Sequence, residues 1–337
     1  MEDVALIADS NGVGYDFVKG IFKYLKSKEN DDFSVSLIDV EKKFFRDGEF
    51  KIKIGGNIRG KRCFIIYDPN KNPSEWFTEL VFLLEATTFS SPEEINLVLP
   101  YTRFARQDRK DESRVSVNVK ALADVVSLYA DRGLTVDLHT PQIQEYFSIP
   151  FDNLYSMISL INHVQKHHQG FLKDLVIVSP DLGGGKRADY LVKKLKERGI
   201  ESGVAFGHKN RDRDNEVSKT VIIGDVAGKN CLIVDDIIDT GNTLIMTANK
   251  LREKGAKGIS AYCTHGLFTE GVDKFRVFDR VFISDTIKPP VASNIEVVSL
   301  VRLFGEAIYR TATGLSLSVL FENVHDNNQH SLENYDI

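Results

Sequence analysis

The sequence predicts an α/β protein with two domains of similar fold, each a largely parallel sheet flanked by helices. Apolar runs of strand length alternate with amphipathic helical segments almost throughout the chain. The segment GKRCFIIYDPNKNPSEWFTELVFLLEAT, from Gly60, also resembles GKNCLIVDDIIDTGNTLIMTANKLREKGA, from Gly228, which suggests two copies of one unit. With 337 residues, of which 42% are apolar, the chain can bury two cores of ordinary size.

The apolar runs are the expected strands. In chain order they are VALIA, FSVSLID, RCFIIY, INLVLP, LTVDLH, LVIVSP, GVAFG, TVIIGDV, CLIVDD, GISAYCTHG, RVFISD and IEVVSL. In open parallel sheets ligands bind beyond the carboxyl ends of the strands, so we expect the functional side chains directly after these runs. A chance match between two α/β units is the alternative explanation of the internal similarity.

The composition argues against nucleic acid and membrane partners. The 43 basic and 48 acidic side chains give a net charge of −5 and are spread along the chain, without a basic field. No apolar run approaches the roughly 20 residues of a membrane span, and MEDVALIADSNG lacks the features of a signal peptide, so we expect a cytoplasmic protein. Cys63, Cys231 and Cys263 lie in apolar runs and are expected to be core residues. The polar tail, residues 323–337, is expected to be disordered.

The segment CLIVDDIIDTGNTLIMTANKL, residues 231–251, gathers acids and hydroxyls after an apolar run. We expect the strand to end at Val234 and a helix to follow the turn. Between them lie Asp235, Asp236, Asp239, Thr240, Gly241, Asn242 and Thr243. Amides and hydroxyls at a helix N-terminus suit a phosphate, whereas the acids suit sugar hydroxyls or Mg²⁺, so the segment predicts a ribose 5-phosphate site. An acidic helix N-cap without a ligand is the alternative.

This segment resembles the phosphoribosyl-diphosphate loop of the type I phosphoribosyltransferase fold. Four further stretches resemble the ribose-phosphate diphosphokinase family, the phosphoribosyl-diphosphate synthetases: PYTRFARQDRKDESR, TVDLHTPQIQEYFSIPFDNLYS, VSPDLGGGKRADYL and HKNRDRDNEV. The resemblance covers about residues 1–322. It implies two phosphoribosyltransferase-type domains: 1–156, on the ATP side with a degenerate ligand loop, and 157–322, with the ribose 5-phosphate loop.

Two stretches point to a nucleotide. Two cations and an amide lie within four residues, at Arg106, Gln107 and Arg109, and this pattern suits the phosphates and the nucleobase of a nucleotide. A run of solvated charged residues without a ligand is the alternative. The resemblance implies ATP binding by Phe45, Asp47, Gly48, Glu49, Arg106, Gln107 and Arg109. In the family the Asp-Gly-Glu turn reaches the adenine across a subunit interface. This implies a homo-oligomer based on dimers, with a hexamer as one form, whose ATP site is shared between subunits.

Metal and catalytic residues are also implied. Asp137 and His139 alternate around Leu138 on an expected strand and would face the same side, although a strand-end histidine is often structural. The resemblance implies that His139 and Asp181, with Asp137 nearby, hold the Mg²⁺ of ATP. Gly183, Gly184 and Gly185 could form a turn whose amides cradle a diphosphate, with Lys186 and Arg187 adding charge. The polar stretch from His208 reads as a surface loop; in the family it is the mobile catalytic loop, with Lys209 and Arg211 as catalytic cations.

The expected reaction is transfer of the β,γ-diphosphoryl group of Mg-ATP to the C1 hydroxyl of ribose 5-phosphate. A phosphoribosyltransferase that consumes the product, and a non-catalytic regulatory homologue, are the alternatives. The chain departs from the family pattern at Asn57, where a serine is usual, and at Ser148, where an aspartate is usual. Residues that match the family's regulatory phosphate site are Arg59, Arg114, Asp152, Ser316 and Ser318, so allosteric control stays an open expectation.

Overall fold

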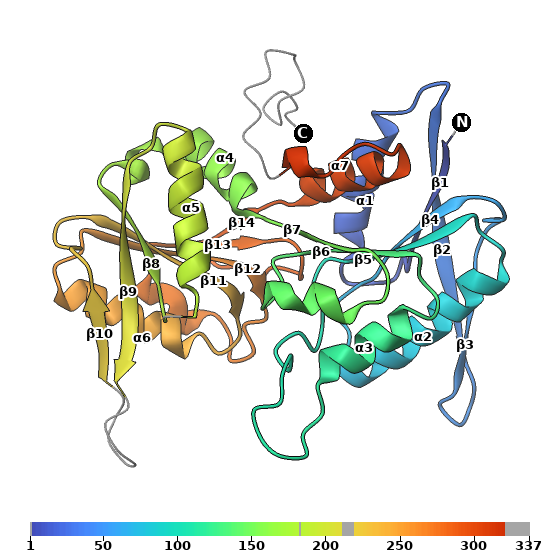
Figure 1. The fold of residues 1–337 in the computed structure, drawn as a ribbon, viewed down its shortest axis with the longest axis horizontal. Coiled ribbons are helices and arrows are strands. Elements are labelled where there is room, and N and C mark those ends of the chain that lie inside the picture. Colours follow the sequence, from blue (N-terminus) through green and yellow to red (C-terminus); the bar gives the residue numbers. More distant parts are fainter. Residues whose placement is uncertain (1, 182, 211–218, 321–337) are drawn as a thin grey trace. The chain divides into compact units, whose positions relative to one another are not determined.

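The computed structural model describes residues 2–181, 183–210 and 219–320, which form two compact units (Figure 1). Unit 1 contains residues 2–155, 286–288 and 300–320, and unit 2 contains the described parts of 156–285 together with 289–299. Residues 300–320 were expected in the second domain but belong to unit 1. Arg211 and the tail, residues 323–337, lie outside the described residues.

Unit 1 is built on a seven-stranded sheet with the order β3-β2-β1-β4-β5-β6-β7. Its strands are β1 (Glu2–Ala8), β2 (Phe33–Phe44), β3 (Phe50–Ile54), β4 (Arg62–Ile66), β5 (Glu94–Leu99), β6 (Arg132–Val136) and β7 (Phe151–Leu154). Its helices are α1 (Tyr15–Lys26), α2 (Pro73–Phe89), α3 (Asn118–Val126), the 3₁₀ helix η1 (Pro141–Tyr146), α7 (Val301–Ala312) and the 3₁₀ helix η4 (Ser318–Leu320). The hairpin β2–β3 is antiparallel and the other pairings of this sheet are parallel.

Unit 2 repeats this strand order as β10-β9-β8-β11-β12-β13-β14. Its strands are β8 (Leu175–Ser179), β9 (Ser202–Asn210), β10 (Lys219–Ile223), β11 (Asn230–Ile238), β12 (Gly258–Gly266), β13 (Arg280–Ser284) and β14 (Ile295–Val298). Its helices are α4 (Met157–His167), the 3₁₀ helix η2 (Gln169–Leu172), α5 (Gly185–Glu197), α6 (Asn242–Glu253) and the 3₁₀ helix η3 (Asp273–Val277). Each strand of unit 1 thus has a counterpart seven strands later, and the similar segments from Gly60 and Gly228 contain the counterparts β4 and β11. The shared topology supports two copies of one unit.

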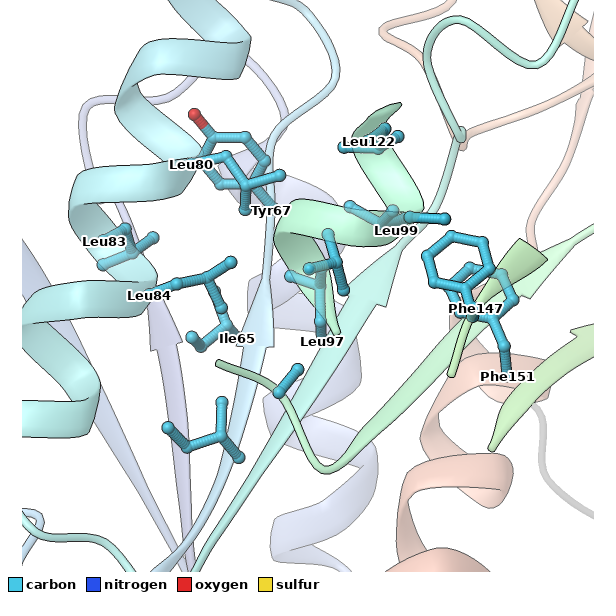
Figure 2. Packing of buried hydrophobic residues seen from close by; sticks show 14 of the residues in the cluster. Ile65, Tyr67, Leu80, Leu83, Leu84, Leu97, Leu99, Leu122, Phe147 and Phe151 are labelled. Carbon is cyan, nitrogen blue, oxygen red and sulfur yellow. The ribbon is translucent and has the colours of Figure 1, made fainter. Parts of the chain in front are cut away.

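The core of unit 1 forms where α2 covers the central strands (Figure 2). Leu80 and Leu84 of the helix are fully buried against Ile65 of β4 and Leu97 of β5. At the far edge Phe147 stacks on Phe151 with ring centroids 3.7 Å apart. Apolar side chains that are two apart on a strand share one face, so the strand runs supply this core directly.

The last helix, α7, packs on α1 within unit 1, with Phe17 and Phe304 in an edge-to-face contact of 5.5 Å (Figure 1). Tyr24 donates its buried hydroxyl to the Glu306 carboxylate at 2.5 Å, and burial followed by this bond raises the pKa of Tyr24. This buried bond and the ring contact explain why the chain end belongs to unit 1 and not to the domain that precedes it in sequence.

Unit 2 has apolar clusters on both faces of its sheet, because residues of β8 and β11 alternate between them. Cys63, Cys231 and Cys263 are free and buried, which confirms their prediction as core residues. Burial raises the pKa of Cys63 to about 12 and that of Cys231 to about 11. Among the described residues, no helix combines the length and apolar character needed to cross a membrane.

Candidate active site

Strand β11 carries the acidic residues and extends further than expected. It does not end at Val234 but continues to Ile238, because Asp235, Ile237 and Ile238 pair with β12. On its other side β11 pairs with β8 only as far as Ile233. The carboxylates therefore lie on a strand that is paired on one side only, beyond the carboxyl end of its neighbour. This is the position at which open α/β sheets bind ligands.

Arg187 of α5 holds the two adjacent acids. One of its terminal nitrogens, Nη1, lies 3.2 Å from Asp236 Oδ1 and 3.5 Å from Asp235 Oδ1. Burial, followed by the neighbouring Asp236 carboxylate, raises the pKa of Asp235 to about 8, whereas the Arg187 charge acts to lower it. Asp236 is 4% exposed. The sequence had suggested Arg187 only as extra charge near the glycine turn, and its pairing with the acids was missed.

The turn after β11 begins helix α6 at Asn242. Gly241 has a φ of +74°, and a Cβ at this position would lie 2.2 Å from the ring of Phe275. Glycine is therefore required both by its conformation and by the close approach of the buried ring. Asn242 accepts a hydrogen bond from Lys274 at 3.3 Å, and Asp239 accepts one from the Thr269 hydroxyl at 2.6 Å. The turn is thus fixed by residues 269–275.

The second loop of unit 2 connects β8 to α5. The exposed Asp181 carboxylate accepts a hydrogen bond from the Gly184 amide at 2.9 Å, and the Asp181 carbonyl accepts one from the Ser179 hydroxyl at 2.6 Å. A Cβ on Gly184 would lie 2.7 Å from Ser179 Oγ, so this glycine is needed for close approach rather than for its φ of −76°. The following α5 presents Arg187 to the β11 acids. Both loops therefore converge on one end of the sheet.

In unit 1, the predicted nucleotide residues lie in the loop before α3. Arg106 and Arg109 are exposed, and Gln107 donates to the Arg109 carbonyl at 3.2 Å. Asp108 accepts a hydrogen bond from the Thr140 hydroxyl at 2.6 Å. Because Thr140 directly follows His139, this bond brings the arginine loop beside the predicted metal-binding histidine.

The predicted arrangement of Asp137 and His139 on one strand is wrong. Strand β6 ends at Val136, and Asp137 has a φ of +41°, so strand alternation does not apply to these residues. Asp137 is 6% exposed, whereas His139 is exposed. The Asp137 amide donates to the Leu154 carbonyl at 2.9 Å. The burial of Asp137 favours a structural role for it, and His139 is the residue that solvent can reach.

The predicted adenine-binding turn joins β2 to β3. The Phe45 amide donates to the Glu49 carbonyl at 2.7 Å, and Glu49 in turn donates its amide to the Asp47 carboxylate at 3.1 Å. Gly48 has a φ of +94°, which suits glycine at this tight turn. The turn is exposed throughout, and 48% of the Phe45 side chain is accessible. It is free to contact another molecule.

The residues that match a regulatory site all lie in unit 1. Asp152 is paired with Arg132 at 2.7 Å, and the Ser316 and Ser318 hydroxyls are 2.7 Å apart. Arg59 and Arg114 are exposed, and Arg114 has a φ of +66°.

Unit 1 carries a network of charged side chains near the carboxyl end of β1, the counterpart of β8. At the carboxyl end of β1, Lys42 lies 2.7 Å from Asp9 and 3.4 Å from Glu79, and Lys71 pairs with the same two acids. Glu79 is 2% exposed. Burial raises the pKa of Asp9, but the bond to Lys42 and the other favourable contacts outweigh it, so that its pKa is lowered. In this network the lysines of unit 1 neutralise its buried acids. This fits the prediction that unit 1 kept the fold but not the ligand loop.

Comparison with known proteins agrees with this architecture. A model of the N-terminal domain of ribose phosphate pyrophosphokinase matches residues 17–128, and a phosphoribosyl transferase domain model matches residues 152–294. The ribose-phosphate pyrophosphokinase of Chlorobaculum tepidum is 40% identical over 293 residues, which cover 85% of this chain and 88% of that protein. The chain belongs to the ribose-phosphate pyrophosphokinase family. The pyrophosphokinase of Rhizobium meliloti is similar at 39% identity, with 82% of this chain and 90% of that protein covered.

A solved structure of the family shows the same fold. The phosphoribosylpyrophosphate synthetase from Mycobacterium smegmatis superposes with a TM-score of 0.81 at 27% identity, covering 93% of this chain and all of that one. The predicted fold class, two phosphoribosyltransferase-type units, is therefore confirmed.

Proposed function

We propose that the protein transfers the β,γ-diphosphoryl group of ATP to the C1 hydroxyl of ribose 5-phosphate, forming 5-phosphoribosyl 1-diphosphate and AMP. The observation that carries this proposal is the half-paired end of β11, where two carboxylates held by Arg187 precede a glycine turn and a helix N-terminus. The family membership supports the reaction. In this reaction the anomeric hydroxyl attacks the β-phosphorus of ATP, and AMP departs.

The ribose phosphate is assigned to unit 2. The amides of the turn 240–243 and the hydroxyls of Thr240 and Thr243 would donate to the 5-phosphate at the N-terminus of α6, where the helix dipole also favours an anion. Asp235 and Asp236 would accept hydrogen bonds from the ribose hydroxyls and so orient C1. Because burial keeps Asp235 partly protonated near neutrality, a hydrogen-bond donor or a cation at this place favours its charged form.

ATP is assigned to the exposed cations Arg106 and Arg109, together with the β2–β3 turn of a second subunit in a dimer-based homo-oligomer. Mg²⁺ would arrive with the nucleotide, and the exposed His139 and Asp181 offer imidazole and carboxylate ligands to it. Bound there, Mg²⁺ would neutralise charge on the phosphates. Lys209, in β9, and Arg211 are proposed to stabilise the migrating group.

An assay of the full-length protein tests the proposal. Incubation with ATP, ribose 5-phosphate and Mg²⁺ should release AMP and form the 1-diphosphate. Asp236→Asn should raise the KM for ribose 5-phosphate, whereas the matched Asp225→Asn, whose side chain is 76% exposed and lies on the loop before β11, should leave it unchanged. Consumption of 5-phosphoribosyl 1-diphosphate with a nucleobase, without AMP release from ATP, would assign the protein to the phosphoribosyltransferases instead.

A further inference from the structure

A second cluster of ligating side chains lies in unit 2, at the C-terminal end of α4. The Nε2 atoms of His163 and His168 lie 2.6 Å and 2.8 Å from the same oxygen, Oε1 of Glu296 in β14. The three ligating atoms lie within 4.8 Å of one another. Two imidazoles and a carboxylate that meet at one point are a ligand set typical of Zn²⁺.

Strands β12 and β13 separate this cluster from the β11 acids. Glu296 is the second residue of β14 and pairs with Phe282, and Arg280 is the first residue of β13. Phe282 in turn pairs with Tyr262 of β12, and Tyr262 pairs with Val234 of β11, so Glu296 is level with Val234 but lies three strands away from it. The reaction proposed above does not use these residues.

The ligands are held in place but can be reached. The Phe282 ring packs against the His163 ring at 6.0 Å and the His168 ring at 5.5 Å. The side chains of His163, His168 and Glu296 are 20%, 17% and 30% exposed, so an ion can enter from solvent.

Arg280 contacts two members of the cluster, Glu296 and His168. Its Nε lies 2.9 Å from Glu296 Oε2, which leaves Oε1 to the histidines, and its Nη1 lies 3.0 Å from His168 Nδ1. When Arg280 donates to Nδ1, the proton of a neutral imidazole is on Nε2 and points at Glu296. A metal ion needs the lone pair of Nε2, which moves that proton to Nδ1. Arg280 must then release Nδ1 while it keeps Oε2.

We propose that His163, His168 and Glu296 form a binding site for a divalent transition-metal ion, with Zn²⁺ as the preferred ion and Arg280 as a competing cation that weakens it. In a tetrahedral zinc site the ligand atoms are roughly 3.3 Å apart, from Zn–N and Zn–O lengths of about 2.0–2.1 Å, so the present contacts of 2.6 Å and 2.8 Å need to open only slightly. Water would complete the coordination. The bound ion joins α4 to β14 and stabilises unit 2.

Zinc titration of metal-free full-length protein, measured by competition with a chromophoric chelator, tests the site. We expect one zinc ion more per chain in the wild type than in His163→Asn, His168→Asn or Glu296→Gln. His167→Asn is the matched control: this exposed neighbour has its ring 4.8 Å from that of His163 but is not one of the three ligands. Zinc bound at the predicted catalytic site is the same in all variants and cancels in the comparison.

Two further measurements sharpen the test. Zn²⁺ should raise the Tm of the wild type and of His167→Asn more than that of His168→Asn, and circular dichroism confirms that each variant is folded. Arg280→Gln should tighten zinc binding by about tenfold, because it removes a positive charge from beside Glu296 and His168. AMP formation at saturating Mg²⁺ should be unchanged in His168→Asn. Equal zinc content in the wild type and the three ligand variants, or an equal loss in His167→Asn, overturns the proposal.

Discussion

Replacing Gly241 by alanine tests the physical basis of the proposed phosphate turn. The residue has a φ of +74°, and the added Cβ would lie 2.2 Å and 2.6 Å from two ring atoms of Phe275, a fully buried side chain of η3. Either the ring or the turn must move. Because Phe275 also packs edge-to-face on Phe268 at 5.0 Å, the ring has little freedom and the turn is expected to shift.

The size of the effect follows from two terms. A left-handed conformation costs an alanine about 1–2 kcal/mol. Forcing a methyl group into a filled core costs about 1–3 kcal/mol more. The free energy of unfolding of unit 2 should therefore fall by about 2–5 kcal/mol.

Gly255→Ala provides the matched control for this change. Gly255 follows the same helix, α6, with a φ of +81°, but an added Cβ would have its nearest neighbour 4.0 Å away. This variant carries only the conformational term, about 1–2 kcal/mol. Urea unfolding followed by circular dichroism compares the two variants. Equal midpoints for Gly241→Ala and Gly255→Ala would show that the approach of Phe275 does not constrain the turn.

The same pair of variants separates stability from binding. In Gly241→Ala a shifted turn should raise the KM for ribose 5-phosphate while the KM for ATP changes little, because the nucleotide is assigned to other loops. Gly255→Ala should keep both values. A wild-type KM for ribose 5-phosphate in folded Gly241→Ala would remove the turn from the phosphate site.

Three further predictions concern charge. The pKa of Asp235 is raised to about 8, so the folded ligand-free protein holds a proton that the unfolded chain releases near pH 4. The free energy of unfolding should therefore fall as the pH rises from about 4 to 8. In urea titrations at several pH values, Asp235→Asn should show a weaker dependence of this free energy on pH. Arg187→Met removes a cation from beside the buried Asp236 and should lower the unfolding free energy by roughly 1–3 kcal/mol at pH 8. The loss should be smaller at pH 5, because Asp235 then carries a proton. Lys209→Ala should lower the turnover number by roughly 10²–10³-fold in AMP-release assays, and near-normal turnover would exclude the proposed role.

Two strands that the sequence did not predict show the limit of apolar patterning as a signal for strands. Each apolar run contains a strand, but β3 (FKIKI) and β7 (FDNL) were missed. Both are edge strands at the ends of the unit 1 sheet. An edge strand needs less apolar surface, and lysine on an edge discourages pairing with other molecules, so such strands carry a weak apolar signal. Residues 300–320 belong to unit 1 because they contact α1, which is distant from them in the sequence. No local sequence pattern reveals such a contact.

The site could be predicted in its residue types but not in its geometry. The acids and the turn 240–243 stand out in the sequence because helix N-termini and carboxylates have known binding chemistry. The continuation of β11 past Asp235 was missed, since a strand paired on one side tolerates polar residues that a central strand would exclude. The pairing of Arg187 with both acids joins residues about 50 positions apart and follows only from the packing of α5 beside β11.

The two units have the same strand order but treat charge at the carboxyl ends of their central strands differently. In unit 1 the lysines Lys42 and Lys71 compensate Asp9 and Glu79, so the network is complete without a ligand. In unit 2 Arg187 lies beside two adjacent carboxylates, and burial, followed by the charge of Asp236, raises the pKa of Asp235. A buried acid that is costly to ionise gains most from a ligand that supplies hydrogen-bond donors or cations. The buried Asp235, whose pKa is raised, is thus the physical reason why the substrate is assigned to unit 2 and not to unit 1.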